Sequence, residues 1–255
     1  MYANKLYFEA TALLYTLSVI MILIVIAGML ASVSLWTKGK KPSLYHAINF
    51  PAIIKAFICD VVLQLQILKI SFIRWLMHFC IFIGFMGLLA ETSVMAFMSH
   101  FLSPDNAIAK TFFDYEAGGG ARILDVWGEV FGLMLLFGLT IAIIRRYIIP
   151  AKQLETISKD TVSIVFLTAI VLTGFFCEAV RLMYPEYALV ASYSFAGKFL
   201  AGIFKSMGFD LMNYKVWVWV HAAISMLFLT YIPFSKAWHI FVSPLEIVID
   251  ASERA

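Results

Sequence analysis

Charged side chains are scarce in this sequence. Of its 255 residues only 14% are charged, whereas 62% are hydrophobic. A typical soluble domain carries about 25% charged residues, and a soluble fold has no means of hiding so much apolar surface. The composition therefore excludes an ordinary soluble protein and favours an integral membrane protein.

Cysteine is nearly absent as well. Cys59, Cys80 and Cys177 stand alone, and the sequence contains no Cys-x-x-Cys pair. Neither an iron–sulfur cluster nor a covalently attached c-type haem is therefore encoded in this chain. Because no basic cluster is interleaved with aromatic residues, nucleic-acid binding is excluded too.

Long apolar runs are abundant. A run of about 18 or more apolar residues predicts a membrane span, and a span in lipid satisfies its backbone groups most simply as a helix. Such runs occupy residues 11–36, 75–101, 126–144, 161–183 and 216–239, the last of them loosened around Pro233. We expect an all-α integral membrane protein, with residues 1–255 forming one five-helix bundle.

Two further segments predict helices at the membrane surface. Residues 53–70 are apolar but broken by Lys55, Asp60 and Lys69, which favours an interfacial helix, with a sixth span as the alternative. Residues 194–207 place apolar side chains at four-residue steps, a pattern typical of an amphipathic helix. Residues 116–120, Glu-Ala-Gly-Gly-Gly, are expected to form a flexible loop.

Loop charges predict the orientation. One set of loops carries Lys38, Lys40, Lys41, Lys55, Lys69, Arg74, Arg145, Arg146, Lys152 and Lys159. The opposite set carries Lys5, Lys110, Arg122, Lys198, Lys205 and Lys215. Because the more basic side is cytoplasmic, we expect the N-terminus outside and the C-terminus in the cytoplasm.

The histidines are the candidate cofactor ligands. An ionisable residue inside a membrane is costly and is a functional hypothesis by default, and a neutral imidazole is a natural axial ligand of haem iron. His78 begins the second span and His239 ends the fifth, so both imidazoles are expected at a similar depth near the cytoplasmic face. His46 lies in a loop and is expected at the surface or against a partner.

His221 adds a second level. It precedes His239 by 18 residues, which is about five whole helical turns, so both would share a helix face roughly 27 Å apart. Two stacked haems need such a spacing. The alternative is that these histidines only form hydrogen bonds to neighbouring helices.

The last span carries a family resemblance. His221, then Pro233-Phe-Ser-Lys236, His239, and the downstream Pro244 and Glu246 closely resemble the last helix of the respiratory nitrate reductase gamma-subunit family. Arg74-Trp-Leu-Met-His78 followed by Gly84 resembles the start of its second helix. Residues 60–66 are similar to relatives that dock to heterodisulfide-reductase-like iron–sulfur subunits, as in the transmembrane redox complexes of sulfate reducers. The similarity covers about residues 57–248.

The resemblance implies a membrane cytochrome b. Position by position, His78 and His239 match the axial ligands of the haem b nearer the cytoplasm, and His221 matches one ligand of an outer haem. The other outer ligand would stand ten residues after His78, where Leu88 cannot bind iron. His100 is the histidine that could replace it, and a solvated loop position is the alternative.

Two charged residues are candidates for quinone and proton chemistry. Glu91 lies inside the second span and could take a proton released from a quinol, or it could form a structural pair with Arg122 or Arg181. Arg122 occupies roughly the position, before the third span, where the family carries a basic quinone-site residue. It could donate a hydrogen bond to a quinone carbonyl, or it could be an interfacial charge. Glu129, Glu178 and Arg181 are expected to be helix-end residues.

These observations predict an electron-transfer subunit in a prokaryotic inner membrane. It would pass electrons between menaquinone or ubiquinone, or an outer multihaem cytochrome c in the periplasm, and a cytoplasmic iron–sulfur subunit. The haem would supply the redox chemistry and the protein the ligands and the low dielectric. The alternative is a haem-free membrane anchor or a small proton-coupled transporter subunit.

Overall fold

The computed structural model describes residues 11–37, 49–102, 106–113, 119–149, 158–184, 191–208 and 214–253, and every regular element in these ranges is helical. The chain forms two compact units. One comprises Met1–Lys69, Glu155–Leu167 and Ala222–Ala255, and the other comprises Ile70–Leu154 and Thr168–His221. We describe each unit by itself.

Four helical stretches in the described ranges are long and apolar enough to cross a membrane: Phe72–Met98, Arg122–Ile148, Asp160–Arg181 and Tyr214–Phe234. They belong to α5 (Phe72–Phe101), α7 (Gly119–Ile143), α8 (Ser158–Arg181) and α10 (Tyr214–Tyr231). Exposed apolar side chains such as Phe97, Phe137, Val165 and Leu227 give these helices surfaces suited to lipid. The all-helical membrane architecture is thereby confirmed for four of the predicted spans.

The first predicted span is a helix, α2 (Thr11–Thr37). Its described apolar stretch, Thr16–Ser32, is shorter than the four spanning stretches, so the count of five spans stays a prediction. In its own unit, α2 packs against the 3-10 turn η4 (Ile232–Phe234), where Gly28 faces Pro233. A Cβ on Gly28 would lie 2.6 Å from Cβ of Pro233, so only glycine permits this close approach.

The segment at 53–70 is not one helix but three short ones. It contains α3 (Phe50–Ala56), the π-helical turn η1 (Phe57–Val62) and α4 (Leu65–Ile70), and none is long enough to span a membrane. The chain bends at Gln64, which adopts a left-handed φ of 53°. In this unit α3 and η1 pack on α11 (His239–Glu253), and the interfacial position stays a prediction.

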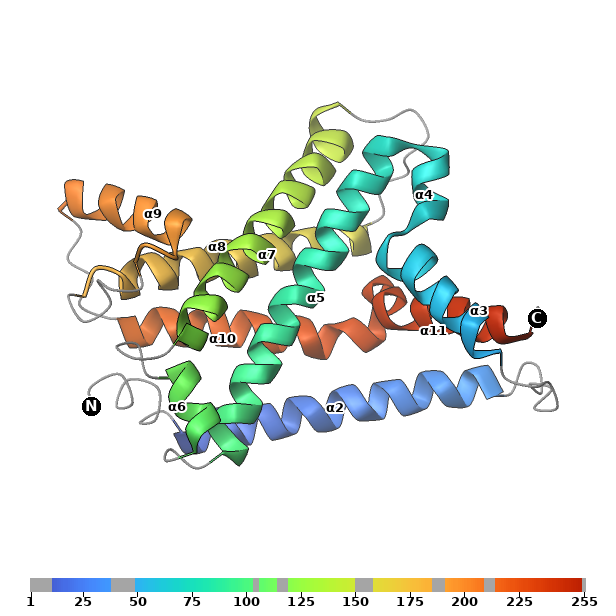
Figure 1. Ribbon diagram of the computed structural model, residues 1–255, viewed down its shortest axis with the longest axis horizontal. Coiled ribbons are helices and arrows are strands. Elements are labelled where there is room, and N and C mark those ends of the chain that lie inside the picture. Colours follow the sequence, from blue (N-terminus) through green and yellow to red (C-terminus); the bar gives the residue numbers. More distant parts are fainter. Residues whose placement is uncertain are drawn as a thin grey trace. The chain divides into compact units, whose positions relative to one another are not determined.

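In the second unit α5 and α7 lie side by side over much of their length (Figure 1). Glycines make this approach close, because a Cβ on Gly84 would lie 2.6 Å from the backbone nitrogen of Leu135 and one on Gly138 would lie 2.8 Å from that of Ile81. Leu135 is fully buried in the resulting interface. Small residues are the usual means of bringing membrane helices together.

The amphipathic helix predicted at 194–207 is present as α9 (Phe195–Ser206). Its inner face packs against Ala179 and Leu182, whereas the predicted four-residue stripe is exposed, with Phe199 at 70% and Met207 at 66%. Three helical elements were not predicted from the sequence as separate elements: α6 (Ala107–Phe113), the π-helical end η2 (Ile144–Ile148) and α11.

Two expectations about local structure are wrong. Gly119 and Gly120 belong to α7 and not to a loop, whereas residues 116–118 lie outside the described ranges. The fifth span does not continue as one helix to His239, because α10 ends at Tyr231 and is followed by η4, an extended Ser235 and a second 3-10 turn, η5 (Lys236–Trp238). Pro233 lacks the N–H that a continuing helix needs.

Candidate functional site

His221 lies in α10 with its ring against α8 of the same unit. Its Nδ1 is 2.9 Å from Oγ1 of Thr173, and the Thr173 hydroxyl also reaches the carbonyl oxygens of Ala169 at 2.7 Å and Ile170 at 3.2 Å. When the hydroxyl gives its single proton to one of these carbonyls, it can accept from Nδ1–H, and the lone pair of the neutral imidazole is then on Nε2. Gly174 allows the α8 backbone to approach, since a Cβ there would lie 3.4 Å from Cε1 of His221.

His239 stands where η5 ends and α11 begins. Its Nδ1 is 2.6 Å from the carbonyl oxygen of Lys236, and a carbonyl oxygen can only accept. Nδ1 therefore carries the proton and Nε2 carries the lone pair, as in His221. This is the tautomer in which protein carbonyls and hydroxyls hold an imidazole that binds a metal through Nε2, so both residues fit the requirements of a haem ligand.

The other histidines are placed less fully. His78 is half-buried in the second turn of α5, next to Phe79, whose ring stacks on Trp75 at 5.2 Å between centroids. His100 is in the last turn of α5, but its side chain lies outside the described structure, as does the whole of His46. His78 and His239 belong to different units, so their pairing stays a prediction.

The ideal-helix spacing of His221 and His239 does not hold. Because the α-helix ends at Tyr231, the 18 residues between them do not form five regular turns. The shared helix face and the separation of about 27 Å therefore do not follow from that spacing. The assignment of each histidine as a ligand is not affected, since it depends on its own surroundings.

A cluster of ionisable side chains lies inside the second unit. Arg181 of α8 donates to Oδ1 of Asp125 of α7 at 2.7 Å, and it lies 3.7 Å from Oε1 of Glu178. Glu129, fully buried one turn after Asp125, accepts the backbone N–H groups of Ala196 and Gly197 at 3.0 and 2.8 Å. Glu178 and Arg181 stand in the last turn of α8, as predicted, whereas Glu129 lies inside α7 and not at its end. The contacts of Arg181 with Asp125 and of Glu129 with α9 are tertiary.

Glu91 borders this cluster from α5. Its Oε2 would lie 3.2 Å from a Cβ on Gly128 of α7, and it is within electrostatic range of Glu178, Asp125 and Arg181. The expected structural pairing of Arg181 with Glu91 is replaced by the pairing with Asp125. We refer to Glu91, Asp125, Glu129, Glu178 and Arg181 as the carboxylate cluster.

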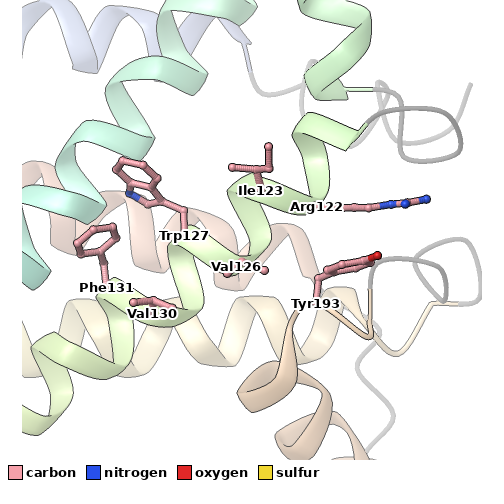
Figure 2. A pocket seen from close by; sticks show the side chains of 7 residues that line it. All are labelled: Arg122, Ile123, Val126, Trp127, Val130, Phe131 and Tyr193. Atoms are coloured by element: carbon pink, nitrogen blue, oxygen red, sulfur yellow. The ribbon is translucent and has the colours of Figure 1, made fainter.

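Arg122 lies at one end of an apolar groove on α7. Figure 2 shows Arg122 beside Tyr193, with Trp127 and Phe131 towards the other end. The groove has a volume of about 520 Å³ and is otherwise lined by Ile123, Val126 and Val130. The guanidinium carbon of Arg122 stands 5.4 Å above the ring centroid of Tyr193. An apolar groove of this size with two polar groups at one end suits a flat, lipid-soluble ligand.

The groove and the carboxylate cluster are neighbours across α7. The indole N–H of Trp127 donates to the carbonyl oxygen of Gly87 at 2.9 Å, and a Cβ on Gly87 would collide with the ring of Phe131. This turn of α5 leads directly to Glu91, which packs on Gly128, the residue after Trp127. The turn of α5 from Gly87 to Glu91 thus contacts the groove residues Trp127 and Phe131 at one end and belongs to the carboxylate cluster at the other.

Sequence reasoning missed Asp125 and did not connect Glu129 with α9. The available signal was the spacing of Asp125 and Glu129, which puts two carboxylates on one face of a membrane helix. Their partners could not be found in this way, because Arg181 and Gly197 are 56 and 68 residues away along the chain.

Comparison with known proteins identifies relatives. Residues 54–247 match the HdrE family, a subunit of dihydromethanophenazine:CoB–CoM heterodisulfide reductase. The heterodisulfide reductase subunit of this description from Methanosarcina mazei is 28% identical over 214 residues, which cover 84% of this chain and 72% of the relative. The matched part of its Methanosarcina acetivorans counterpart, 28% identical over 197 residues, covers 77% of this chain and 66% of the relative.

A further relative is a much longer protein. The EtfAB:quinone oxidoreductase of Syntrophomonas wolfei is 34% identical over 128 residues, which cover 46% of this chain and 18% of that protein. No solved structure matches this chain. The expected resemblance to heterodisulfide-reductase-like membrane subunits is confirmed, whereas a place in the nitrate reductase gamma-subunit family is not supported. With four apolar helices and a match over well over half of its length, the chain is a multi-pass membrane protein that belongs to the HdrE family of heterodisulfide reductase subunits.

Proposed function

We propose that the protein is the b-type cytochrome of a membrane-bound redox complex. It passes electrons between a lipid-soluble two-electron carrier and an iron–sulfur subunit on the cytoplasmic side. The names of its relatives contain two such carriers, dihydromethanophenazine and quinone. Menaquinone and ubiquinone are the carriers we expect of a quinone-linked protein.

The observation that carries this proposal is the hydrogen bonding of His221 and His239. Each Nδ1 lies within hydrogen-bond distance of an oxygen that can accept its proton, which would leave the Nε2 lone pair for a metal. His239 with His78 would hold the inner haem b, and His221 would hold one side of an outer haem with His100 opposite. When bound, the haem supplies one-electron redox chemistry, and the imidazoles fix its position and tune its potential.

The apolar groove would receive the carrier. Trp127 and Phe131 offer aromatic faces to a flat ring, and the Arg122 guanidinium and the Tyr193 hydroxyl can donate to its polar atoms. Glu91, which lies behind the Trp127 turn, is the candidate acceptor for a proton released on oxidation. A carrier in the membrane is favoured over a periplasmic multihaem cytochrome c, since no relative's name contains the latter.

The names of the long relatives support the iron–sulfur partner, since one of them is a probable iron-sulfur-binding oxidoreductase. In EtfAB:quinone oxidoreductase the similar segment is only 18% of the protein, so most of that chain has other roles. This chain carries no cysteine motif for a cluster, so the iron–sulfur chemistry would come from a partner. The basic side of the protein, with its Lys and Arg clusters at the span ends, would face the cytoplasm and this partner, with the N-terminus outside.

The test is an absorption spectrum of the purified protein, expressed together with its proposed iron–sulfur partner. The dithionite-reduced minus oxidised difference spectrum should show b-type haem bands. His239→Ala and His78→Ala should each remove the inner haem, and His221→Ala should remove the outer one. His100→Ala decides whether His100 completes the outer site, because an unchanged haem content would exclude it.

The competing function is a haem-free anchor or a proton-coupled transporter subunit. The carboxylate cluster inside the membrane is the observation that favours it, since membrane carboxylates often serve proton pathways. The same spectrum separates the two functions. A protein that is folded and assembled but shows no haem bands would exclude the cytochrome and leave the transporter.

A further inference from the structure

The carboxylate cluster has more acids than it has cations. Four carboxyl groups, from Glu91, Asp125, Glu129 and Glu178, meet one guanidinium, that of Arg181. Asp125 and Glu129 are at most 8% exposed, and the Glu178 side chain is 17% exposed. In a membrane interior a net charge of this size is not sustained, because each uncompensated carboxylate costs several kcal/mol.

The hydrogen bonds indicate which groups are ionised. Asp125 holds a charge-assisted bond to Arg181, and Glu129 accepts two N–H groups at the N-terminus of α9, where negative charge is favoured. Both contacts stabilise a carboxylate. Glu178 lies 3.7 Å from an arginine already engaged by Asp125, and Glu91 packs on the Gly128 backbone. The excess protons therefore belong to Glu91 and Glu178.

A second observation points to a proton entering the cluster. Oδ2 of Asp125 is buried and, among the residues that the structure describes, has no hydrogen-bond partner, although Oδ1 of the same carboxylate binds Arg181. A buried acceptor without a donor is costly, and a water molecule or a protonated neighbouring carboxyl that donates to it would satisfy it. Within the described residues no group of histidine, cysteine and acidic side chains is arranged to hold a metal ion.

We propose that the carboxylate cluster is a proton relay with its entrance at Glu91 and its exit at Glu178. This inference rests on the proposed function, because the carrier in the groove is the source of the protons. Glu91 packs on Gly128, the residue after Trp127 of the groove wall, and Glu178 stands in the last turn of α8 with 17% of its side chain exposed. Arg181 contacts both Asp125 and Glu178, which makes Asp125 the proposed intermediate acceptor.

The relay accounts for the protons that the carrier releases when it is oxidised. A reduced two-electron carrier breaks two O–H or N–H bonds when it is oxidised, and its two electrons leave one at a time to the haem chain. Each proton passes to the Glu91 carboxyl as a proton already held by the cluster leaves through Glu178 to water. The charge of the cluster is the same before and after each transfer, so no bare charge is created inside the membrane.

The charged and titratable groups of the relay come from three helices, and a fourth contributes backbone groups. Glu91 belongs to α5, Asp125 and Glu129 to α7, and Glu178 and Arg181 to α8, while α9 presents its backbone N–H groups. Arg122, one turn before Asp125 on α7, is the cation at the groove end. The residue that would hold the carrier, Arg122, is thus only three residues before Asp125, which belongs to the relay.

The test uses the assembled complex in nanodiscs with duroquinol as the reductant. Glu91→Gln should slow the reduction of haem by duroquinol by about 100-fold, the usual share of a proton-transfer group. The effect should appear in kcat and not in KM. Glu91→Asp should recover most of the rate, and Glu178→Gln should slow it as well. The haem content and the dithionite-reduced spectrum should be unchanged in every variant and serve as the check for folding.

Infrared difference spectroscopy detects a change in the protonation of Glu91, which a purely structural role of this residue would not produce. Reduction of the wild-type complex should shift the C=O stretching band of a protonated carboxylic acid, and Glu91→Gln should abolish part of it. Asp160→Asn is the matched control, since Asp160 pairs with Lys236 in the other unit and should leave band and rate unchanged. Normal duroquinol oxidation and an unchanged band in Glu91→Gln would overturn the relay while leaving the cytochrome intact. A wild-type complex without haem would overturn both.

Discussion

The Arg181 guanidinium donates to Oδ1 of Asp125 at 2.7 Å, and the two side chains are only 12% and 7% exposed. A nearly buried ion pair of this kind contributes little net stability, but breaking it leaves a charge that nothing compensates. Arg181→Ala should therefore lower the free energy of unfolding by about 3–5 kcal/mol. Thermal unfolding in a mild detergent, followed by the loss of tertiary absorbance signals, measures this change.

A second ion pair supplies the control. Lys236 lies 3.2 Å from Asp160, but its side chain is 50% exposed, so solvent screens the pair. Lys236→Ala should cost at most about 1 kcal/mol. The double variant Asp125→Asn/Arg181→Met should be more stable than Arg181→Ala alone, because it removes both charges. If Arg181→Ala were as mild as Lys236→Ala, the buried pair would not exist in solution.

The contact between α5 and α7 depends on glycine. A Cβ added at Gly84 would lie 2.6 Å from the Leu135 nitrogen, and backbone cannot move aside as a side chain end can. Gly84→Ala should force the helices apart and destabilise the protein by about 1–3 kcal/mol. Unfolding in detergent gives the magnitude, and the haem spectrum reports whether the bundle still assembles.

Gly202 is the matched glycine. It lies on the exposed side of α9 in the same unit, with no described atom within 4 Å of an added Cβ. Gly202→Ala should be neutral or stabilise by up to about 1 kcal/mol, because alanine favours a helix. Equal losses for both alanine variants would show that helix packing is not the cause.

The helices themselves could largely be predicted from the sequence, and their side-chain partners could not. A run such as residues 161–183 becomes α8 because length and low charge suffice to specify a helix in lipid. The exposed stripe of α9 was predicted for the same reason, since it depends on local periodicity. Pairing Asp125 with Arg181 needs the rotation and separation of two helices, which no local pattern contains.

The end of α10 departs from ideal helix geometry because of one residue, Pro233. Pro233 was expected to loosen the helix, but the helix stops at Tyr231, and Ser235 starts a new turn by accepting the N–H of Ala237 at 3.2 Å. This new turn brings the carbonyl of Lys236 to Nδ1 of His239. The sequence indicated that His239 is a ligand candidate but not how its ring is held.

The Glu129 carboxylate holds the beginning of α9. It accepts the N–H groups of Ala196 and Gly197, and Glu178 packs against Gly197 beside it. Glu129→Ala should release this end and speed hydrogen exchange of both amides, whereas Glu129→Gln keeps one acceptor oxygen and should have a smaller effect. Hydrogen–deuterium exchange of the peptide that contains α9 measures this. Unchanged exchange in Glu129→Ala would mean that α9 is held by its apolar face alone.

Thr173 fixes the imidazole of His221, and its removal tests the haem assignment without touching a ligand. Thr173→Val keeps the shape of the side chain but deletes the oxygen that accepts from Nδ1–H. Because such partners commonly account for 10–100-fold in metal affinity, the outer haem should be retained about tenfold less well and titrate at a shifted potential. Thr173→Ser should restore both properties, since it returns the hydroxyl. The control lies on the same helix: the buried Thr168 hydroxyl has no hydrogen-bond partner among the described residues, so Thr168→Val should leave the haem unchanged. A potentiometric titration of each variant decides the matter, because a haem insensitive to Thr173→Val does not depend on the contact between Thr173 and His221.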